Sequence, residues 1–332
     1  MYTINDFAMM TPMRYYNNED ENNQKRIDMI NNKNNEYIAT KKNDGDWAML
    51  IHYSQGNNLI RSRSISKVTG VYGDYTEKVP HITEEMDSWP DNTAVLAELC
   101  WDQDGTNANT VGTILRCLPA KAVERQKENK LKAVVFDLLM FKGQDMTDFG
   151  YYRRFTWWQE FATTQKGKYI HPTEIIENDF AEAADRIIAN GGEGIVIQRK
   201  DYTYNPGSRT AWKTLKLKQQ LPEMELKVMG VLEPNKFYEG DCPETWEYAI
   251  DGVLVTKPYY YGWKNGITVL LPDGTRCDVA SGLTDEDREW LATESAAKMI
   301  QDGELFAVVK AMSFNDKGRL RHPSLVRLRN DL

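Results

Sequence analysis

Short apolar runs punctuated by polar residues predict several strands in the first two thirds of the chain. Their lengths and branched or aromatic residues are typical of β-strands. Residues 180–190 instead carry apolar positions at helical spacing and end at Asn190-Gly191-Gly192, a typical helix C-terminus. A weaker helical signal lies in the Asn-, Asp- and Glu-rich residues 17–35. The predicted strands are residues 36–40, 94–99, 133–141 and 194–198. This mixture favours an α+β domain with substantial antiparallel sheet.

The pattern becomes mostly β after Gln219-Gln220-Leu221-Pro222. Turn signals at Pro272-Asp273-Gly274 and 315–318 separate hairpin arms. One helix is expected after Thr284, a plausible N-cap followed by acidic residues. The strands predicted here are residues 225–232, 252–257, 266–271 and 306–313. Such short strands with one inserted helix predict a small Greek-key barrel of the OB-fold type. We therefore expect two domains, residues 1–221 and 222–332.

Composition limits the class of protein. A chain of 332 residues and 38.3 kDa can bury two cores. No apolar run approaches the roughly 18 residues that span a bilayer, and the first residues lack the features of a secretion signal. We expect a cytoplasmic protein that does not bind membranes. Its cysteines form no C-x-x-C pair, which favours reduced thiols over zinc or disulfides; they are Cys100, Cys117, Cys242 and Cys277.

A net charge of −8 argues against bulk attraction to nucleic acid. Binding to DNA would require local clusters of basic residues. Three such clusters occur, within residues 61–67, 199–218 and 317–329. The alternative is that each cluster is an ordinary solvated surface.

Six short motifs follow one another in an order that suits nucleotidyl transfer. They are Lys42-Asn43-Asp44-Gly45, Ser62-Arg63, Glu98 within residues 95–99, Phe136-Asp137-Leu138-Leu139, Glu193-Gly194-Ile195-Val196-Ile197 and Lys216-Leu217-Lys218. Lys42 is the candidate nucleophile. An amine attacks phosphorus only when unprotonated, and a free lysine titrates near pH ~10.4. Lys216 and Lys218, on one face of a strand, would lower its proton affinity by repulsion, as would a divalent metal ion.

Each motif residue also has a structural interpretation. The two lysines are equally typical of an edge strand protected against aggregation. Glu98 lies in an apolar run, where a carboxylate is costly unless paired or functional. Glu193 follows two glycines and precedes a buried-looking strand. Either glutamate alone would suit an exposed strand end, and Phe136 would suit a core as well as a ligand contact.

The ordered set resembles the covalent nucleotidyltransferase superfamily of DNA ligases, RNA ligases and messenger-RNA capping enzymes. The stretch Gly318-Arg319-Leu320-Arg321-His322-Pro323-Ser324 is similar to small ATP-dependent DNA ligases of bacteriophages. The resemblance implies a site in which Lys42 becomes joined to AMP. It further implies that Thr40 and Lys41 line the base edge, Phe136 stacks on the purine, Arg63 and Glu98 contact the ribose, Glu98 and Glu193 hold metal, and Lys216 and Lys218 contact the α-phosphate. Candidate contacts to DNA or pyrophosphate are Arg61, Arg209, Arg321, Arg327 and Arg329.

By the same resemblance, we expect a monomeric enzyme that seals nicks in duplex DNA with ATP and Mg²⁺, or Mn²⁺. The reaction would pass through lysyl-AMP and an adenylated DNA 5′-end, in the cytoplasm of a bacterial or phage-infected cell. Two alternatives stay open. One is an RNA ligase or capping-type guanylyltransferase, and the other is a non-catalytic OB-fold protein that binds nucleic acid.

The chain departs from the family pattern at four positions. Trp47 stands where the first motif usually has arginine, and Thr40 stands where many DNA ligases have glutamate. Gln198 replaces the lysine that commonly ends the glutamate motif. Leu332 stands where the last motif has lysine. The base selection and pyrophosphate contacts associated with these positions are therefore open.

Overall fold

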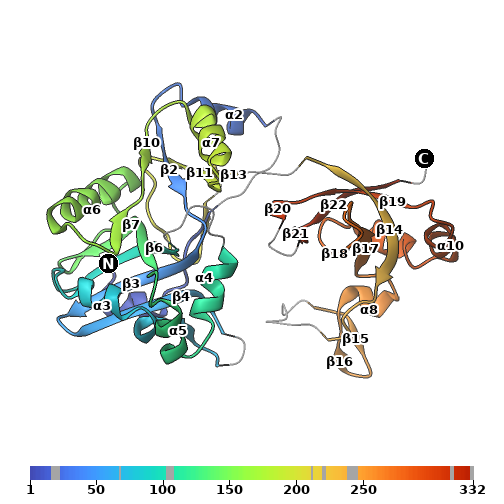
Figure 1. The fold of residues 1–332 in the computed structure, drawn as a ribbon, viewed down its shortest axis with the longest axis horizontal. Coiled ribbons are helices and arrows are strands. Elements are labelled where there is room, and N and C mark those ends of the chain that lie inside the picture. Colours follow the sequence, from blue (N-terminus) through green and yellow to red (C-terminus); the bar gives the residue numbers. More distant parts are fainter. Residues whose placement is uncertain are drawn as a thin grey trace. The chain divides into compact units, whose positions relative to one another are not determined.

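The computed structural model describes residues 1–15, 23–66, 69–101, 108–210, 212–218, 222–237, 246–314 and 318–329. The chain forms two compact units, Met1–Lys218 and Gln219–Leu332, which are described separately (Figure 1). The predicted boundary after residue 221 lies three residues beyond this division. Cys242 and the terminal Leu332 lie outside the described residues.

A seven-stranded sheet forms the larger part of the first unit. Its neighbouring strands pair antiparallel, except that β9 pairs parallel with β7. In spatial order they are β5 (Tyr72–Asp74), β4 (Asn57–Ile65), β3 (Asp46–Ser54), β6 (Thr93–Cys100), β7 (Lys132–Phe141) and β8 (Gln144–Asp145), with β9 (Ile170–Pro172) beside β7. The central strands are apolar on both faces because both faces are covered. The predicted strands 94–99 and 133–141 are thereby confirmed.

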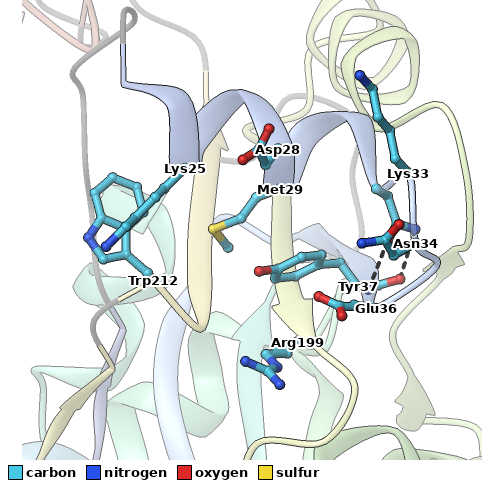
Figure 2. Close-up of a pocket in the computed structure, with 10 residues that line it drawn as sticks. Lys25, Asp28, Met29, Lys33, Asn34, Glu36, Tyr37, Arg199 and Trp212 are labelled. Carbon is cyan, nitrogen blue, oxygen red and sulfur yellow. Dashed lines mark hydrogen bonds between the residues drawn. The ribbon is translucent and has the colours of Figure 1, made fainter.

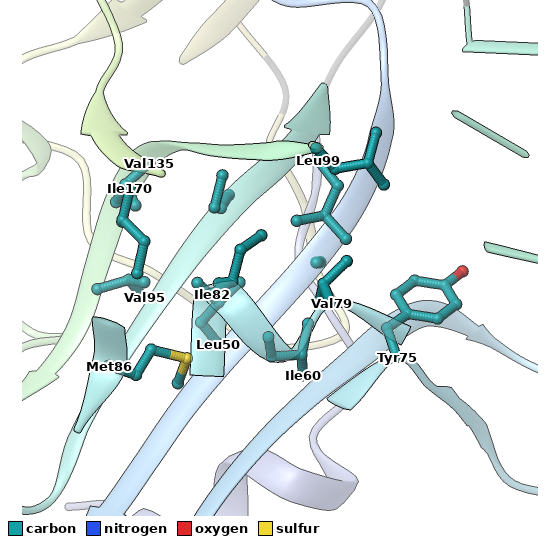
Figure 3. Close-up of a cluster of buried hydrophobic side chains, with 14 of the residues drawn as sticks. Leu50, Ile60, Tyr75, Val79, Ile82, Met86, Val95, Leu99, Val135 and Ile170 are labelled. Atoms are coloured by element: carbon teal, nitrogen blue, oxygen red, sulfur yellow. The ribbon is translucent and has the colours of Figure 1, made fainter. Parts of the chain in front are cut away.

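One face of this sheet packs against helices that the sequence pattern did not predict. Figure 3 shows Leu50, Ile60 and Val95 of the strands beside Ile82 and Met86 of α3. These helical elements are η1 (Thr76–Lys78), α3 (Pro80–Met86), α4 (Ala108–Leu115), α5 (Pro119–Arg125) and α6 (Tyr151–Gln165). Burial of this cluster provides most of the hydrophobic stabilisation of that face.

The opposite face of the seven-stranded sheet buries a second cluster. Met49 and Leu96 pack there with Phe7 of α1 (Ile4–Met9) and with Tyr202 and Tyr204. Trp47 and Phe136 lie at its edge and are only partly buried. Part of this face is therefore a closed core, and the part near Trp47 and Phe136 is a surface that can line a pocket.

A second, four-stranded antiparallel sheet completes the first unit. Its order is β10 (Ile175–Ile176), β2 (Tyr37–Lys42), β11 (Gly194–Arg199) and β13 (Thr214–Lys218). One face packs on α7 (Phe180–Ala189), with α2 (Gln24–Asn31) beside that helix. The predicted strands 36–40 and 194–198 and the helix at 180–190 are confirmed. A two-residue parallel pair, β1 (Arg14–Tyr15) with β12 (Arg209–Thr210), lies apart from this sheet.

The second unit is built on a five-stranded antiparallel sheet. Its order is β18 (Arg276–Val279), β17 (Gly266–Leu270), β14 (Met224–Leu232), β19 (Phe306–Lys310) and β22 (Ser324–Arg329). Val228, Ile267 and Val309 belong to its core. A parallel bridge between Ser281 and Ser324 links the segment after β18 to the start of β22. Two short hairpins accompany the sheet: β15 (Ala249–Ile250) with β16 (Val253–Leu254), and β20 (Ser313–Phe314) with β21 (Leu320–Arg321).

Three expectations for this unit were wrong in detail. The predicted strand 252–257 shortens to β16, because Thr256 caps a helix, α8 (Lys257–Tyr261), and Pro258 suits its first turn. The single helix after Thr284 is two helices, α9 (Asp285–Trp290) and α10 (Glu294–Asp302), because the side chain of Thr293 caps a new start. The predicted strand 306–313 ends at Lys310, and Ser313 begins β20.

Candidate active site

Two strands that flank β11 place lysine side chains on one face of the four-stranded sheet. Lys42 of β2 and Lys218 of β13 both pair with Gly194 of β11. Two residues along, Thr40 and Lys216 both pair with Val196. Paired residues point to the same face, and so do residues two apart on a strand. The register therefore places Lys42, Lys216 and Lys218 on a common face.

Lys42 forms an ion pair with Glu193. Its Nζ lies 2.5 Å from Glu193 Oε2, and the two side chains are 19% and 11% exposed. Glu193 directly precedes β11, so the pairing of β2 with β11 brings the two together. The carboxylate thus orients the candidate nucleophile.

Two glycines make these approaches possible. Gly194 has a φ of +132°, and an added Cβ would lie 2.0 Å from the carbonyl oxygen of Leu217 on β13. A Cβ on Gly45 would lie 2.1 Å from the carbonyl oxygen of Leu99 on β6. Only glycine fits such close backbone contacts. Gly45 therefore sets the segment after Lys42 against the strand that carries Glu98.

The facing sheet contributes the other wall of a pocket. Trp47, Arg63, Glu98 and Phe136 come from β3, β4, β6 and β7. The complete lining is Thr40, Lys41, Lys42, Asn43, Trp47, Arg63, Glu98, Phe136, Val196, Gln198 and Lys216. Most residues predicted to bind nucleotide thus meet in one pocket. Glu193 joins them through its ion pair with Lys42, and Lys218 through the register of β13.

Burial shifts two pKa values in this pocket. Burial raises the pKa of Glu98 to about 8; Lys42 opposes this rise, whereas Glu193, Asp46 and Asp44 add to it. Burial also lowers the pKa of Lys216 to about 8, and the nearby cations Lys42 and Arg63 lower it further. Clustered ionisable groups with perturbed pKa values are typical of functional sites.

The donor set is compatible with a hydrated magnesium ion. Among the described residues, no group of three or more His, Cys, Asp or Glu side chains could hold a metal by itself. Mg²⁺, however, usually takes one or two protein carboxylates and completes its shell with water and substrate phosphate. Glu98 and Glu193 offer two carboxylates close enough to affect each other's charge. Glu98, whose ionised form is disfavoured by burial, would be stabilised by such a cation.

Arg61 does not face DNA or pyrophosphate, contrary to prediction. It is 1% exposed, and its guanidinium donates to the carbonyl oxygens of Phe7 and Met10 at 2.7–3.0 Å. It also lies 4.1 Å from the Tyr72 ring centroid. The basic cluster at 61–67 concealed this role because charge alone does not distinguish a buried arginine from an exposed one. Arg61 attaches α1 to the sheet.

The remaining predicted arginines lie outside the pocket lining. Arg209 is exposed on β12. Arg321 is on β21 and Arg327 on β22, both in the second unit. Arg329, also on β22, pairs through Nη1 with Glu225 of β14. Their contact with DNA or pyrophosphate stays a prediction.

Several pocket residues were not predicted to be functional. Trp47 and Gln198 were noted only as departures from the family pattern, yet both line the pocket. Asn43 and Val196 line it too. In the sequence, Asn43 directly follows Lys42, and Val196 lies two residues from Gly194 on the predicted strand; these positions could have indicated both residues. The buried guanidinium of Arg61 lies 5.8 Å from the Trp47 ring centroid.

A second and larger pocket occurs beside α2 (Figure 2). Its lining includes Lys25, Tyr37, Arg199 and Trp212, but none of the residues predicted to bind nucleotide. Lys25 Nζ lies over the Trp212 ring at 5.8 Å, and Arg199 pairs with Asp201. Lys33, Asp28 and Glu36 also line this pocket, but none of them belongs to the six motifs. Size alone does not make it the candidate active site.

Comparison with known proteins identifies the family of this chain. Residues 22–218 match the family model described as ATP dependent DNA ligase domain. The structure resembles one titled as a structure-function analysis of Lig E DNA ligases, with a TM-score of 0.61, 16% identity and coverage of 89% of this chain and 93% of that one. This likeness supports the fold. The family match covers more than half of the chain, and the chain therefore belongs to the ATP-dependent DNA ligase family.

Curated relatives include DNA ligases from two archaea. The DNA ligase of Methanopyrus kandleri is 24% identical over 226 residues, covering 63% of this chain and 37% of the relative. DNA ligase 2 of Haloquadratum walsbyi is 28% identical over 171 residues, covering 50% of this chain and 27% of the relative. These alignments thus span well under half of each relative's length. Within the part of the chain that the structure describes, no helix is long and apolar enough to cross a membrane.

Proposed function

We propose that this chain is a DNA ligase that uses ATP to seal 5′-phosphate/3′-hydroxyl nicks in duplex DNA. One observation carries the proposal. The Lys42 amine, held by Glu193, lies on one sheet face with Lys216 and Lys218 and in one pocket with Glu98 and Phe136. A nucleophile, facing cations and an aromatic side chain are what transfer of a nucleotide to lysine requires.

In the first step, Lys42 Nζ attacks the α-phosphorus of ATP. A phosphorus–nitrogen bond forms, the bond between the α-phosphorus and the oxygen that bridges to the β-phosphate breaks, pyrophosphate leaves, and the proton lost by the amine passes to solvent. Lys216 and Lys218 stabilise the charge that develops on the α-phosphate. A magnesium ion held by Glu98 and Glu193 would supply further charge neutralisation when bound.

The rest of the nucleotide occupies the pocket away from the lysines. Phe136 stacks on the purine, because an aromatic face matches a flat base. Thr40 and Lys41 line the base edge, and Arg63 and Glu98 contact the ribose. The backbone groups of Lys41 already form hydrogen bonds within the protein. Its N–H donates to the carbonyl oxygen of Glu174, and its own carbonyl oxygen accepts from Thr173 Oγ1. The same carbonyl also accepts from Asn43 Nδ2 at 3.4 Å, so both of its lone pairs are engaged and a backbone contact to the base would lie at Thr40.

Two further steps complete sealing. AMP passes from Lys42 to the 5′-phosphate at a nick, and Arg63 contacts that phosphate. The 3′-hydroxyl then attacks the adenylated phosphate, the DNA backbone is closed and AMP leaves. The first of these steps exchanges a phosphoramidate for a phosphoanhydride, and the second exchanges that anhydride for a phosphodiester, so neither needs a second nucleotide.

We infer that the second unit is an OB barrel that helps to hold the nick. Its support is the strand order β18-β17-β14-β19-β22 with a parallel bridge from Ser281 to Ser324, which joins the two ends of the sheet as a small Greek-key barrel requires. Arg321, Arg327 and Arg329 would contribute cations to DNA. We propose that residues 1–221 and 222–332 act as two domains of a monomer in the cytoplasm of a bacterial or phage-infected cell.

A substrate comparison tests the proposal. The protein is given ATP labelled at the α-phosphate with Mg²⁺, and then nicked DNA or nicked RNA; a parallel sample receives labelled GTP. We expect labelling by ATP and sealing of nicked DNA. Labelling by GTP, or sealing of RNA alone, would instead indicate a capping-type enzyme or RNA ligase. A protein that binds DNA but takes no label would be a non-catalytic binding protein.

A further inference from the structure

Gln198 is a buried polar residue in the wall of the candidate active site. It is 1% exposed and lies on β11, where it pairs with Ile38 of β2 and Thr214 of β13. Its side chain shares the face of the sheet that carries Lys42 and Lys216, and it belongs to the pocket lining. A polar amide in such a place needs hydrogen-bond partners.

Both ends of this amide have a partner in the protein. The hydroxyl of Tyr202 donates to Gln198 Oε1 at 2.8 Å. The side chain of Gln198 also hydrogen-bonds to that of Tyr151, which engages one N–H of Nε2. The amide therefore has its acceptor and one donor engaged within the protein, while the second N–H of Nε2 is left for the pocket.

Tyr202 is held firmly enough to fix the orientation of that amide. Its side chain is 2% exposed and stacks on Tyr151, with ring centroids 5.5 Å apart and planes 5° from parallel. The Tyr202 carbonyl accepts from the N–H of Tyr151 and from Arg154 Nη1. Because Tyr202 cannot easily move, Oε1 stays turned toward its hydroxyl and Nε2 stays turned away.

The position of Gln198 suits the base rather than the phosphates. It lies four residues along β11 from Gly194, the partner of Lys42, or about 13 Å at the rise of a strand. Phosphate-binding lysines occupy the Lys42 end of the pocket. Val196 and Phe136 line it as well, and both have apolar surfaces suited to a purine. A nucleotide with its α-phosphate at Lys42 would extend its base toward Gln198.

We propose that Gln198 recognises the bound purine by donating a hydrogen bond from Nε2 to one of its ring nitrogens. The inference rests on the proposed function, because it requires a nucleotide beside Lys42. The ring nitrogens N1, N3 and N7 of adenine are acceptors, so a buried neutral donor complements them without the cost of burying a charge. A base that lacks the relevant nitrogen leaves the buried N–H unpaired, and such a loss weakens binding strongly.

A purely structural Gln198 would also bond Tyr202, so the test must read out the base itself. Three ATP analogues each replace one ring nitrogen, N1, N3 or N7, by C–H. Covalent labelling of Lys42 is followed by mass spectrometry over a range of concentrations of ATP and of each analogue. The variants are Gln198→Met, which keeps the length but removes the amide, and Tyr202→Phe, which frees the amide to rotate. Gln301→Met, at an exposed position on α10, is the matched control.

We expect the unmodified protein and Gln301→Met to use one analogue about tenfold less efficiently than ATP. Gln198→Met should lose a similar factor with ATP and treat ATP and that analogue alike. Tyr202→Phe should retain only part of the preference. The proposal is overturned if Gln198→Met keeps the full preference among the analogues, or if the unmodified protein has none.

The two hypotheses fail in different ways. If the proposed function is wrong, the unmodified protein takes no label from ATP at any concentration. If only the role of Gln198 is wrong, labelling by ATP proceeds and the analogue preference is absent or does not depend on Gln198. Thermal unfolding of each variant verifies that the compared proteins are folded.

Discussion

At the scale of single residues, Arg61 and Arg63 illustrate how one strand face can serve two purposes. They lie two residues apart on β4 and point to the same side of the sheet. Arg61 is buried beneath α1 and bonded to its carbonyl oxygens, whereas Arg63 is exposed and lines the pocket. The surrounding structure, rather than the charge, decides their roles.

Replacing Arg61 should therefore affect stability. Arg61→Met removes the donors for the Phe7 and Met10 carbonyl oxygens, and we expect the free energy of unfolding to fall by roughly 2–4 kcal/mol. Denaturant unfolding measures this change. The matched variant Arg63→Met should keep nearly normal stability but lose adenylation or nick sealing. Equal stability of the two variants would contradict the assigned role of Arg61.

Lys216 should make stability depend on pH. Its pKa is about 8 in the folded protein and near 10.5 when unfolded, so between these values the unfolded chain binds more protons. Stability attributable to Lys216 is therefore reduced at low pH and recovers as pH rises from about 8 to about 10.5. We expect Lys216→Met to be more stable by roughly 1–3 kcal/mol at pH 7, with the advantage shrinking at higher pH.

Denaturant unfolding at pH 7 and at pH 10 tests this expectation. The exposed Lys213→Met is the control, and its stability should change little at either pH. The same Lys216→Met variant should adenylate poorly, because it lacks a phosphate-binding cation. A gain of stability that is equal at both pH values would rule out the pKa explanation.

At the scale of elements, the close pairing of β11 with β13 depends on Gly194. A Cβ there would meet the Leu217 carbonyl oxygen, and the φ of +132° disfavours any side chain. We expect Gly194→Ala to lower the free energy of unfolding by roughly 2–4 kcal/mol and to reduce adenylation, since Glu193 and Lys218 flank this contact.

Gly230→Ala provides the comparison for that variant. Gly230 also lies in a strand, β14, but nothing lies within 4 Å of an added Cβ. We expect nearly unchanged stability and activity. If Gly194→Ala behaved as mildly as Gly230→Ala in unfolding and labelling assays, the close approach of β11 to β13 would not be required.

The strands of the site could be predicted because their signals are local. Residues 194–198 and 94–99 carry largely apolar runs. The helix at 180–190 has apolar residues at helical spacing and ends at the helix-terminating residues Asn190-Gly191-Gly192. The helices α3 to α6 were missed because they are mostly short, and long-range packing against the sheet stabilises them. Arg61 was misassigned because its burial depends on α1, more than fifty residues earlier.

The pocket could be predicted only in part for the same reason. The motif order indicated Lys42, Glu98 and Lys216, but it could not show that Gln198 bonds Tyr202 or that Trp47 lines the wall. Such contacts depend on how two sheets face each other. The edge position of β13, considered as an alternative explanation for its lysines, is also correct, yet Lys216 still lines the pocket. The bacteriophage subclass stays a prediction.

At the scale of the whole molecule, each unit has a hydrophobic core of its own. Leu50 and Val95 belong to a core of the first unit, whereas Val228 and Val309 belong to that of the second. We therefore expect a fragment of residues 1–218 to unfold cooperatively by itself. It should bind nicked DNA more weakly than the full chain, because it lacks the basic residues of β21 and β22. Calorimetry and a nick-binding titration measure both outcomes; an unfolded fragment, or undiminished nick binding, would contradict this view.

The central claim is that Lys42 becomes covalently joined to AMP. The most direct measurement is mass spectrometry of the protein after incubation with ATP and Mg²⁺, followed by peptide mapping of the adduct. We predict one AMP on Lys42, loss of the adduct when nicked DNA is added, and no adduct in Lys42→Ala with its fold intact. An adduct on another residue, or none in the unmodified protein, would contradict the account.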